Sequence, residues 1–215
     1  MINVIFFDKY GWYALLFAIM GDLLIPFILA PFYRGYSHTS MTISALGNPQ
    51  SPVRIIFNFW MLLEGLLLLF AVPTIYNYYK CSSELLAGIT IAFIIIFAIG
   101  ACIFTCFFSV NETKDVSTTA SKIHGIGSVI GFMVFLFVPL LLSVLEFKND
   151  HKAYGTIAID SFIAAFLFFV LFVMSDKPLF NNTIIAKEGL WQRLNIVFMY
   201  LPIGVISIRN ILEIK

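Results

Sequence analysis

The sequence predicts an all-α fold, a polytopic integral membrane protein built as a six-helix bundle. Apolar stretches of membrane-spanning length recur about six times along the 215 residues, separated by short polar loops. Each crossing of a bilayer core needs roughly 20 apolar residues. The composition agrees, because 60% of the residues are hydrophobic and 12% are charged, and the mean hydropathy is +0.96. No remaining segment is long enough for a separate water-soluble core, so we expect residues 1–215 to form a single membrane domain.

The first span is expected over residues 12–32. Pro26 and Pro31 lie in its second half and predict a kink, because proline lacks the N–H that a helix interior requires. This stretch has the hydrophobicity of a secretion signal, but Asp22 interrupts its apolar region and no small-x-small cleavage site follows. We therefore expect a retained first helix.

The next segment, residues 33–52, is rich in Ser, Thr, Gly and Pro, which predicts an ordered loop dominated by turns. The second span is expected over residues 53–75, and Tyr76, Tyr78 and Tyr79 after it are typical of the headgroup region. A polar surface loop is expected over residues 111–122. The remaining spans are expected over residues 85–108, 124–145, 156–174 and 189–211.

The net charge and the cysteine spacing limit the kinds of partner that the protein is expected to bind. The formal net charge is +1 and no basic run is present, which argues against a nucleic-acid partner. We expect membrane lipids as partners, and a membrane protein or a second copy of the chain as a further possibility. Cys81, Cys102 and Cys106 have no metal-binding spacing with histidines and are interpreted as small apolar side chains.

The sequence predicts the orientation of the chain in the membrane only in part. An even number of spans places both termini on one side, but Lys and Arg divide almost evenly between the two sides, so the positive-inside rule does not choose between them. We adopt cytoplasmic termini, the commoner arrangement for a chain without a cleaved signal.

Two carboxyl groups are expected inside the membrane, Asp22 near the middle of the first span and Glu64 near the middle of the second. An ionised carboxylate there costs about 2.5–3.5 kcal/mol on insertion scales, so each group needs a partner or a function. One interpretation is a polar cavity or a proton-linked site; the other is a protonated or hydrogen-bonded carboxyl that joins helices. If the two acids meet, we expect them to share a proton.

A second polar group is expected on the side away from the termini. The 33–52 loop is polar, and the starts of the second, fourth and sixth spans carry polar residues at steps of three, four or seven, which lie on one helix face. Gly127 and Gly131 form a small-x-x-x-small pair that permits close helix contact. We predict a polar cup at this surface, lined by His38, Ser44, Arg54, Asn58, His124, Glu188 and Arg193. The alternative is that these side chains are ordinary interfacial anchors, caps and packing residues.

Catalytic signatures are weak. His38 and His124 could bind zinc with a carboxylate, but the sequence has no H-x-x-x-H or comparable spacing. Ser40 or Ser44 could serve a Ser–His hydrolase, but no G-x-S-x-G setting surrounds either. His151 is expected on the side of the termini, away from the cup. We therefore predict no metal and no cofactor, and whether the protein is an enzyme stays open.

Several short motifs resemble a known family. The chain resembles domain-of-unknown-function family 998 in His38, Ile43 to Pro49, Pro52, Phe57-Asn58, Gly65, Ser121 to Gly125 and Glu188 to Arg193. It is more distantly similar to the Frag/DRAM/Sfk group of six-helix proteins, whose members are linked to lipid-anchor remodelling, lipid asymmetry and autophagy. The resemblance implies a six-span bundle with ordered loops on one face and a lipid-related role. It implies no catalytic mechanism and does not extend to Asp22 or Glu64.

Three functions follow as hypotheses. In the first, the cup binds or handles an amphipathic lipid: Arg54 and Arg193 meet an anionic headgroup, and His38, Asn58 and His124 supply hydrogen bonds. In the second, the protein is a small transporter that uses Asp22 and Glu64 as a proton-coupled pair. In the third, it is a non-catalytic membrane scaffold whose polar stripes are helix contacts.

Overall fold

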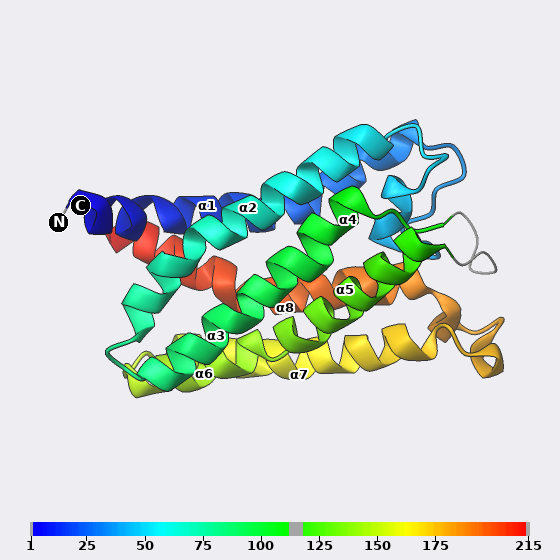
Figure 1. Ribbon diagram of the computed structural model, residues 1–215. Coiled ribbons are helices and arrows are strands. Elements are labelled where there is room, and N and C mark those ends of the chain that lie inside the picture. Colours follow the sequence, from blue (N-terminus) through cyan, green and yellow to red (C-terminus); the bar gives the residue numbers. More distant parts are fainter. Residues whose placement is uncertain (1, 112–117, 214–215) are drawn as a thin grey trace.

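The computed structural model describes residues 2–111 and 118–213, with side chains for residues 9–111 and 118–213. Its regular structure is helical throughout the described residues, and the long helices form one bundle (Figure 1). Six helical stretches are long and apolar enough to cross a membrane: Lys9–Phe32, Arg54–Tyr79, Glu84–Phe107, Thr119–Lys148, Lys152–Met174 and Glu188–Glu213. Each predicted span overlaps one of these stretches, and only Val53 and Phe108 fall outside them. The predicted all-α six-helix bundle is thus confirmed.

Short helices and turns divide these stretches further. The α-helices are α1 (Ile2–Leu29), α2 (Arg54–Tyr79), α3 (Glu84–Phe97), α4 (Phe104–Phe107), α5 (Thr119–Phe135), α6 (Val138–Lys148), α7 (Lys152–Met174) and α8 (Glu188–Glu213). The 3-10 turns are η1 (Ala30–Phe32), η2 (Ile43–Gly47), η4 (Pro178–Phe180) and η5 (Ile184–Ala186). The helix α1 continues through Pro26, and Pro31 lies in the 3-10 turn that follows it.

Two of the predicted spans are interrupted. In the third, the π-helical segment η3 (Ala98–Ile103) separates α3 from α4. The fourth breaks at residues 136–137, between α5 and α6. Pro139 in the first turn of α6 has no N–H to donate, and its ring crowds the preceding turn. Neither interruption was predicted from the sequence, because the apolar run continues through both.

Close helix contact joins the π-helical segment η3 to α5. An added Cβ on Gly100 would lie 2.5 Å from the carbonyl oxygen of Gly127, and one on Gly131 would lie 3.1 Å from the Cβ of Ala101. These positions require small residues because the two backbones touch. The predicted contact role of Gly127 and Gly131 is confirmed, with η3 as the partner.

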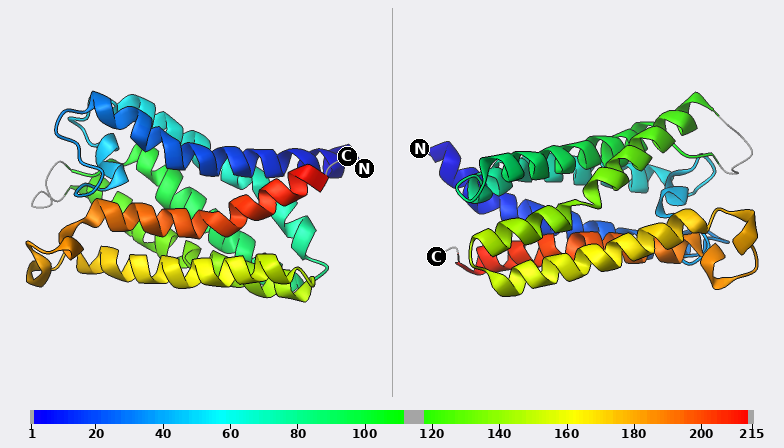
Figure 2. Two further views of the ribbon diagram at one scale, coloured as in Figure 1. Left: turned by 180° about the vertical axis from the view of Figure 1, so that it is seen from behind. Right: turned by 90° about the horizontal axis from the view of Figure 1, so that it is seen from below.

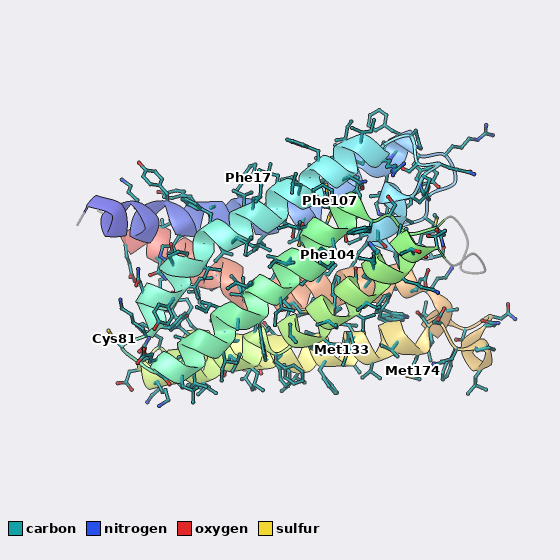
Figure 3. The ribbon with its side chains drawn as sticks, viewed as in Figure 1. Phe17, Cys81, Phe104, Phe107, Met133 and Met174 are labelled. Atoms are coloured by element: carbon teal, nitrogen blue, oxygen red, sulfur yellow. The ribbon has the colours of Figure 1, made fainter. Side chains whose placement is uncertain are left out.

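The bundle has two unlike ends. The helix α1 begins and α8 ends at one end, whereas the segment between α1 and α2 and the one between α7 and α8 lie at the other (Figures 1 and 2). Helix α1 packs against α2 and α8, α7 packs against α6 and α8, and α5 packs mainly against α3 and η3. Large apolar side chains cover the outside, among them Phe17 and Phe107 (Figure 3). Such an exterior suits lipid rather than water.

Candidate functional site

A cavity of ≈ 610 Å³, here called the main cavity, lies inside the bundle and is bounded by α1, η2, α2, α3, η3, α4, α5, α7 and α8. Most of its wall is apolar, formed by side chains such as Phe57, Met61, Phe97, Phe132, Phe169 and Phe172. The few polar groups in the wall are Asp22, Thr42, Ser44, Glu64, Thr105, His124, Ser128 and Gln192. Largely apolar walls with a few placed polar groups are typical of sites for small molecules.

The rim of the main cavity reaches the outer surface between α5 and α7. Val129 and Met133 on α5 line the cavity and are 57% and 49% exposed, and Val173 on α7 is 48% exposed. Met133 lies on the part of the bundle where α5 faces α7 (Figure 3). These residues lie within stretches that are long and apolar enough to span a membrane.

The two intramembrane acids meet at the wall of this cavity. Asp22 of α1 and Glu64 of α2 are both buried, and their carboxyl groups interact electrostatically. The hydroxyl of Tyr200 on α8 donates to Glu64 Oε1 at 2.7 Å, whereas Glu64 Oε2 is buried without a hydrogen-bond partner. The two acids, whose approach the sequence left open, therefore lie together, and Tyr200 is a third member that the sequence did not reveal.

A second, smaller cavity of ≈ 350 Å³ lies between α1, α8 and the 33–53 loop. Its wall includes His38, Thr39 and Arg193 together with apolar residues of α1 and α8. Asp22 lines this cavity as well as the main one. Asp22 thus stands at the boundary between the two cavities.

Arg193 ties the 33–53 loop to α8. Its Nη1 donates to the carbonyl oxygens of His38 at 2.7 Å, Met41 at 3.1 Å and Gly189 at 2.8 Å, and its Nη2 donates to the Tyr36 hydroxyl. Next to it, Gln192 Oε1 accepts from the backbone N–H of Ile43 at 2.7 Å. These bonds hold η2 against the bundle, so the loop is ordered, as its composition predicted.

Two titratable loop residues lie beside this arginine. The ring of His38 stacks on Phe27 with the ring centres 4.5 Å apart, and its Nδ1 is buried without a hydrogen-bond partner. Burial lowers the pKa of the His38 imidazole, and the Arg193 guanidinium lowers it further. Burial raises the pKa of the Tyr36 phenol, and Arg193 opposes that increase.

His124 and Ser44 belong to the main cavity. His124 is buried, with Nδ1 3.0 Å from the carbonyl oxygen of Phe108 and Nε2 3.4 Å from Ser128 Oγ. Ser44 Oγ lies 3.1 Å from the hydroxyl of Thr42. The side chains of His124 and Ser44 both line the main cavity. Because the carbonyl at Nδ1 requires a donor, His124 presents Nε2 as an acceptor when it is neutral.

The structure divides the predicted cup. His38 and Arg193 line the smaller cavity, Ser44 and His124 line the main one, and the other three members line neither. Asn58 Nδ2 instead donates to the carbonyl oxygen of Cys106 at 3.2 Å and joins α2 to α4. Arg54 and Glu188 lie in the first turns of α2 and α8. The seven residues do not line one common cavity.

The structure places His38 and His124 on different cavities. Within residues 9–111 and 118–213, no group of three or more His, Cys, Asp or Glu side chains is arranged to hold a metal ion.

A second buried polar cluster lies at the end of the bundle that holds the termini. Glu146 of α6 is wholly buried and accepts from Arg209 of α8, with Nη1–Oε2 2.7 Å and Nη2–Oε1 3.1 Å. His151 Nδ1 lies 2.9 Å from Glu146 Oε2, and the Tyr79 hydroxyl donates to Oε1. The guanidinium of Arg209 also lies 4.3 Å from the ring centre of Tyr154.

Sequence reasoning missed this cluster because the fourth span was expected to end at Leu145, which left Glu146 in the interfacial region. The sequence did contain a signal for this cluster. Opposite charges stand at the termini-side ends of the fourth and sixth spans, and an even number of crossings brings those ends to one side of the membrane. As expected, His151 lies away from His38 and His124.

Fold and cavities together define a polytopic helical membrane protein with buried acids at the wall of an internal cavity. The chain belongs to the family described as protein of unknown function (DUF998), whose pattern matches residues 15–209, nearly the whole chain. No curated protein and no solved structure matches it significantly.

Proposed function

We propose that this protein binds an amphipathic membrane lipid, with the apolar chain in the main cavity and the polar end at the polar groups of its wall. The observation that carries the proposal is the cavity itself. Its ≈ 610 Å³ falls within the range of about 300–1,000 Å³ that is common for small-molecule sites. Its rim lies between α5 and α7 on a membrane-facing surface, so a lipid can enter from the bilayer without crossing water.

The proposed polar contacts differ from those expected for the cup. Arg193 was expected to meet an anionic headgroup, but its Nη atoms donate to the loop, and Arg54 lines neither cavity. The polar groups within reach of an occupant of the main cavity are Ser44, His124 and the acidic pair. We therefore place the polar end of the lipid at these groups.

The test uses two glycines. A Cβ on Gly125 would meet no atom within 4 Å, and Gly125 lines the main cavity, so Gly125→Phe should place a ring in the cavity without disturbing a helix contact. Gly88 has equally open space but does not line the cavity, so Gly88→Phe is the matched control. Native mass spectrometry of gently extracted protein should find a defined lipid on the wild type and Gly88→Phe but not on Gly125→Phe. Equal retention in all three, or none in the wild type, would refute the proposal.

A second candidate function is the proton-coupled transporter. Its support is that Asp22 lines both cavities and interacts with Glu64, so that one member of a titratable pair stands between the two cavities. It requires a pH-dependent flux in proteoliposomes that Asp22→Asn abolishes. The scaffold hypothesis instead requires that substitutions of the polar residues change stability without a separable loss of binding or flux.

We further propose that the termini lie on the cytoplasmic side. The exposed Cys81, in the turn between α2 and α3, lies at the same end of the bundle as the start of α1 (Figure 3). A membrane-impermeant maleimide should therefore leave Cys81 unlabelled in intact cells and label it after lysis, with Cys81→Ser to measure background from Cys106. Labelling of Cys81 in intact cells would reverse the orientation.

A further inference from the structure

One oxygen atom at the wall of the main cavity lacks a partner. Glu64 is 0% exposed, and although its Oε1 accepts from Tyr200, its Oε2 accepts from no N–H or O–H group among the residues that the structure describes. The other polar side chains beside Glu64 are Cys102 and Asp22, and Asp22 can donate only when its carboxyl group is protonated. A buried acceptor without a donor costs free energy that a bound donor would recover. Because Glu64 lines the main cavity but is 0% exposed, an occupant of that cavity can supply the donor when the Glu64 side chain turns toward it.

The charges around this atom favour a positively charged donor. Asp22 and Glu64 interact with each other, and the permanent cation that acts on Asp22 is Arg193. With both acids ionised, this group would carry one uncompensated negative charge inside the membrane, which is costly. A proton or a cationic ligand removes that charge. The other titratable groups that face the site are Cys102, His124 and Tyr200.

We propose that the Asp22–Glu64 pair binds the ammonium group of a lipophilic amine, which exchanges with a proton held by the pair. This inference rests on the proposed lipid-binding function and names the headgroup. The ammonium donates to Glu64 Oε2, the carboxyl proton leaves to solvent, and the net charge of the site stays the same. The alkyl chain lies along the phenylalanines of the main cavity.

Two alternatives fit less well. An anionic headgroup would meet two acids, while Arg193 is held by the loop and Arg209 by Glu146 at the other end of the bundle. A neutral hydroxyl could donate a hydrogen bond to Glu64 Oε2. It carries no positive charge, however, so the proton would stay on the Asp22–Glu64 pair. Only the amine therefore couples binding to proton release.

The experiment compares dodecylamine, 1-dodecanol and dodecanoic acid, which share one chain and differ in the headgroup. Binding to the full-length protein in nanodiscs is measured with radiolabelled probes between pH 6 and 8, with Gly125→Phe as the cavity control. We expect dodecylamine to bind at least tenfold more tightly than the other two. Its affinity should rise about tenfold per pH unit, since one proton leaves for each amine bound.

The acid variants test the site directly. Glu64→Gln should weaken dodecylamine at least tenfold, remove the pH dependence and leave dodecanol binding within twofold. Glu84→Gln is the control, because Glu84 is an exposed carboxyl that lines neither cavity. If Glu64→Gln does not fold, Asp22→Asn provides the same comparison.

The outcomes separate this inference from the proposed function. Equal binding of the amine and the alcohol, or amine binding without pH dependence, overturns the headgroup assignment. If in that case Gly125→Phe still abolishes dodecanol binding, the lipid-binding function stands. If none of the three probes binds the wild type, both proposals fail.

Discussion

Removal of Arg209 from the buried cluster at the termini end should destabilise the protein strongly. In Arg209→Met the wholly buried Glu146 carboxylate loses both hydrogen bonds to the guanidinium. Breaking a buried ion pair typically costs about 3–5 kcal/mol, because one charge is left uncompensated. Tyr79 and His151 still contact Glu146, so we expect the lower end of that range, about 3 kcal/mol.

The assay is unfolding by increasing SDS in mixed micelles, followed by tryptophan fluorescence. The double variant Glu146→Gln, Arg209→Met carries no unpaired charge, so its loss of stability should be smaller than the sum of the single losses by about 1–3 kcal/mol. Arg34→Met serves as control because Arg34 is exposed. A change below about 0.5 kcal/mol for Arg209→Met, or additive single losses, would refute a stabilising role for the pair.

Further substitutions test the helix contact, the loop and its histidine. Gly100→Ala should lower the free energy of unfolding by about 1–3 kcal/mol, because the new methyl group would meet a carbonyl oxygen of α5; Gly88→Ala, which has open space around it, should not lower it in the same SDS titration. Arg193→Met should speed amide hydrogen exchange over residues 36–43, since the loop loses its bonds to the Arg193 guanidinium; unchanged exchange would contradict that anchoring role. The lowered pKa of His38 means that the unfolded chain takes up the proton first as the pH falls, so stability should decrease as the pH drops below about 6.5. His38→Gln should flatten this part of the profile of Tm against pH, and a profile identical to that of the wild type would show that His38 is not the source.

Much of the fold could be predicted from the sequence because the membrane imposes a strong one-dimensional pattern. A span must be long and apolar, so the six helices were visible as runs of residues. Local chemistry also predicted the ordered 33–52 loop and the close contact at Gly127. The break before Pro139 and the π-helical segment at Ala98–Ile103 escaped prediction, because hydrophobicity does not change at either place.

The site could be predicted only in part. Asp22 and Glu64 stood out because a charge inside a membrane needs a partner, and the structure brings them together. The predicted cup grouped seven residues by their depth and helix face. Depth alone does not say which helices are neighbours, and the structure distributes these residues between two cavities and several helix contacts.

By itself, the sequence determined that this is a helical membrane protein with six stretches long and apolar enough to span a membrane, and that two of these stretches carry an acid near the middle. Only the tertiary structure decided that Arg193 holds a loop, that Glu146 pairs with Arg209, and that Asp22 and Glu64 share the wall of a cavity open between α5 and α7. The physical reason is that span length and hydrophobicity are properties of single segments. Contacts and cavities depend on which helix faces pack together, and side chains distant in the sequence decide that packing.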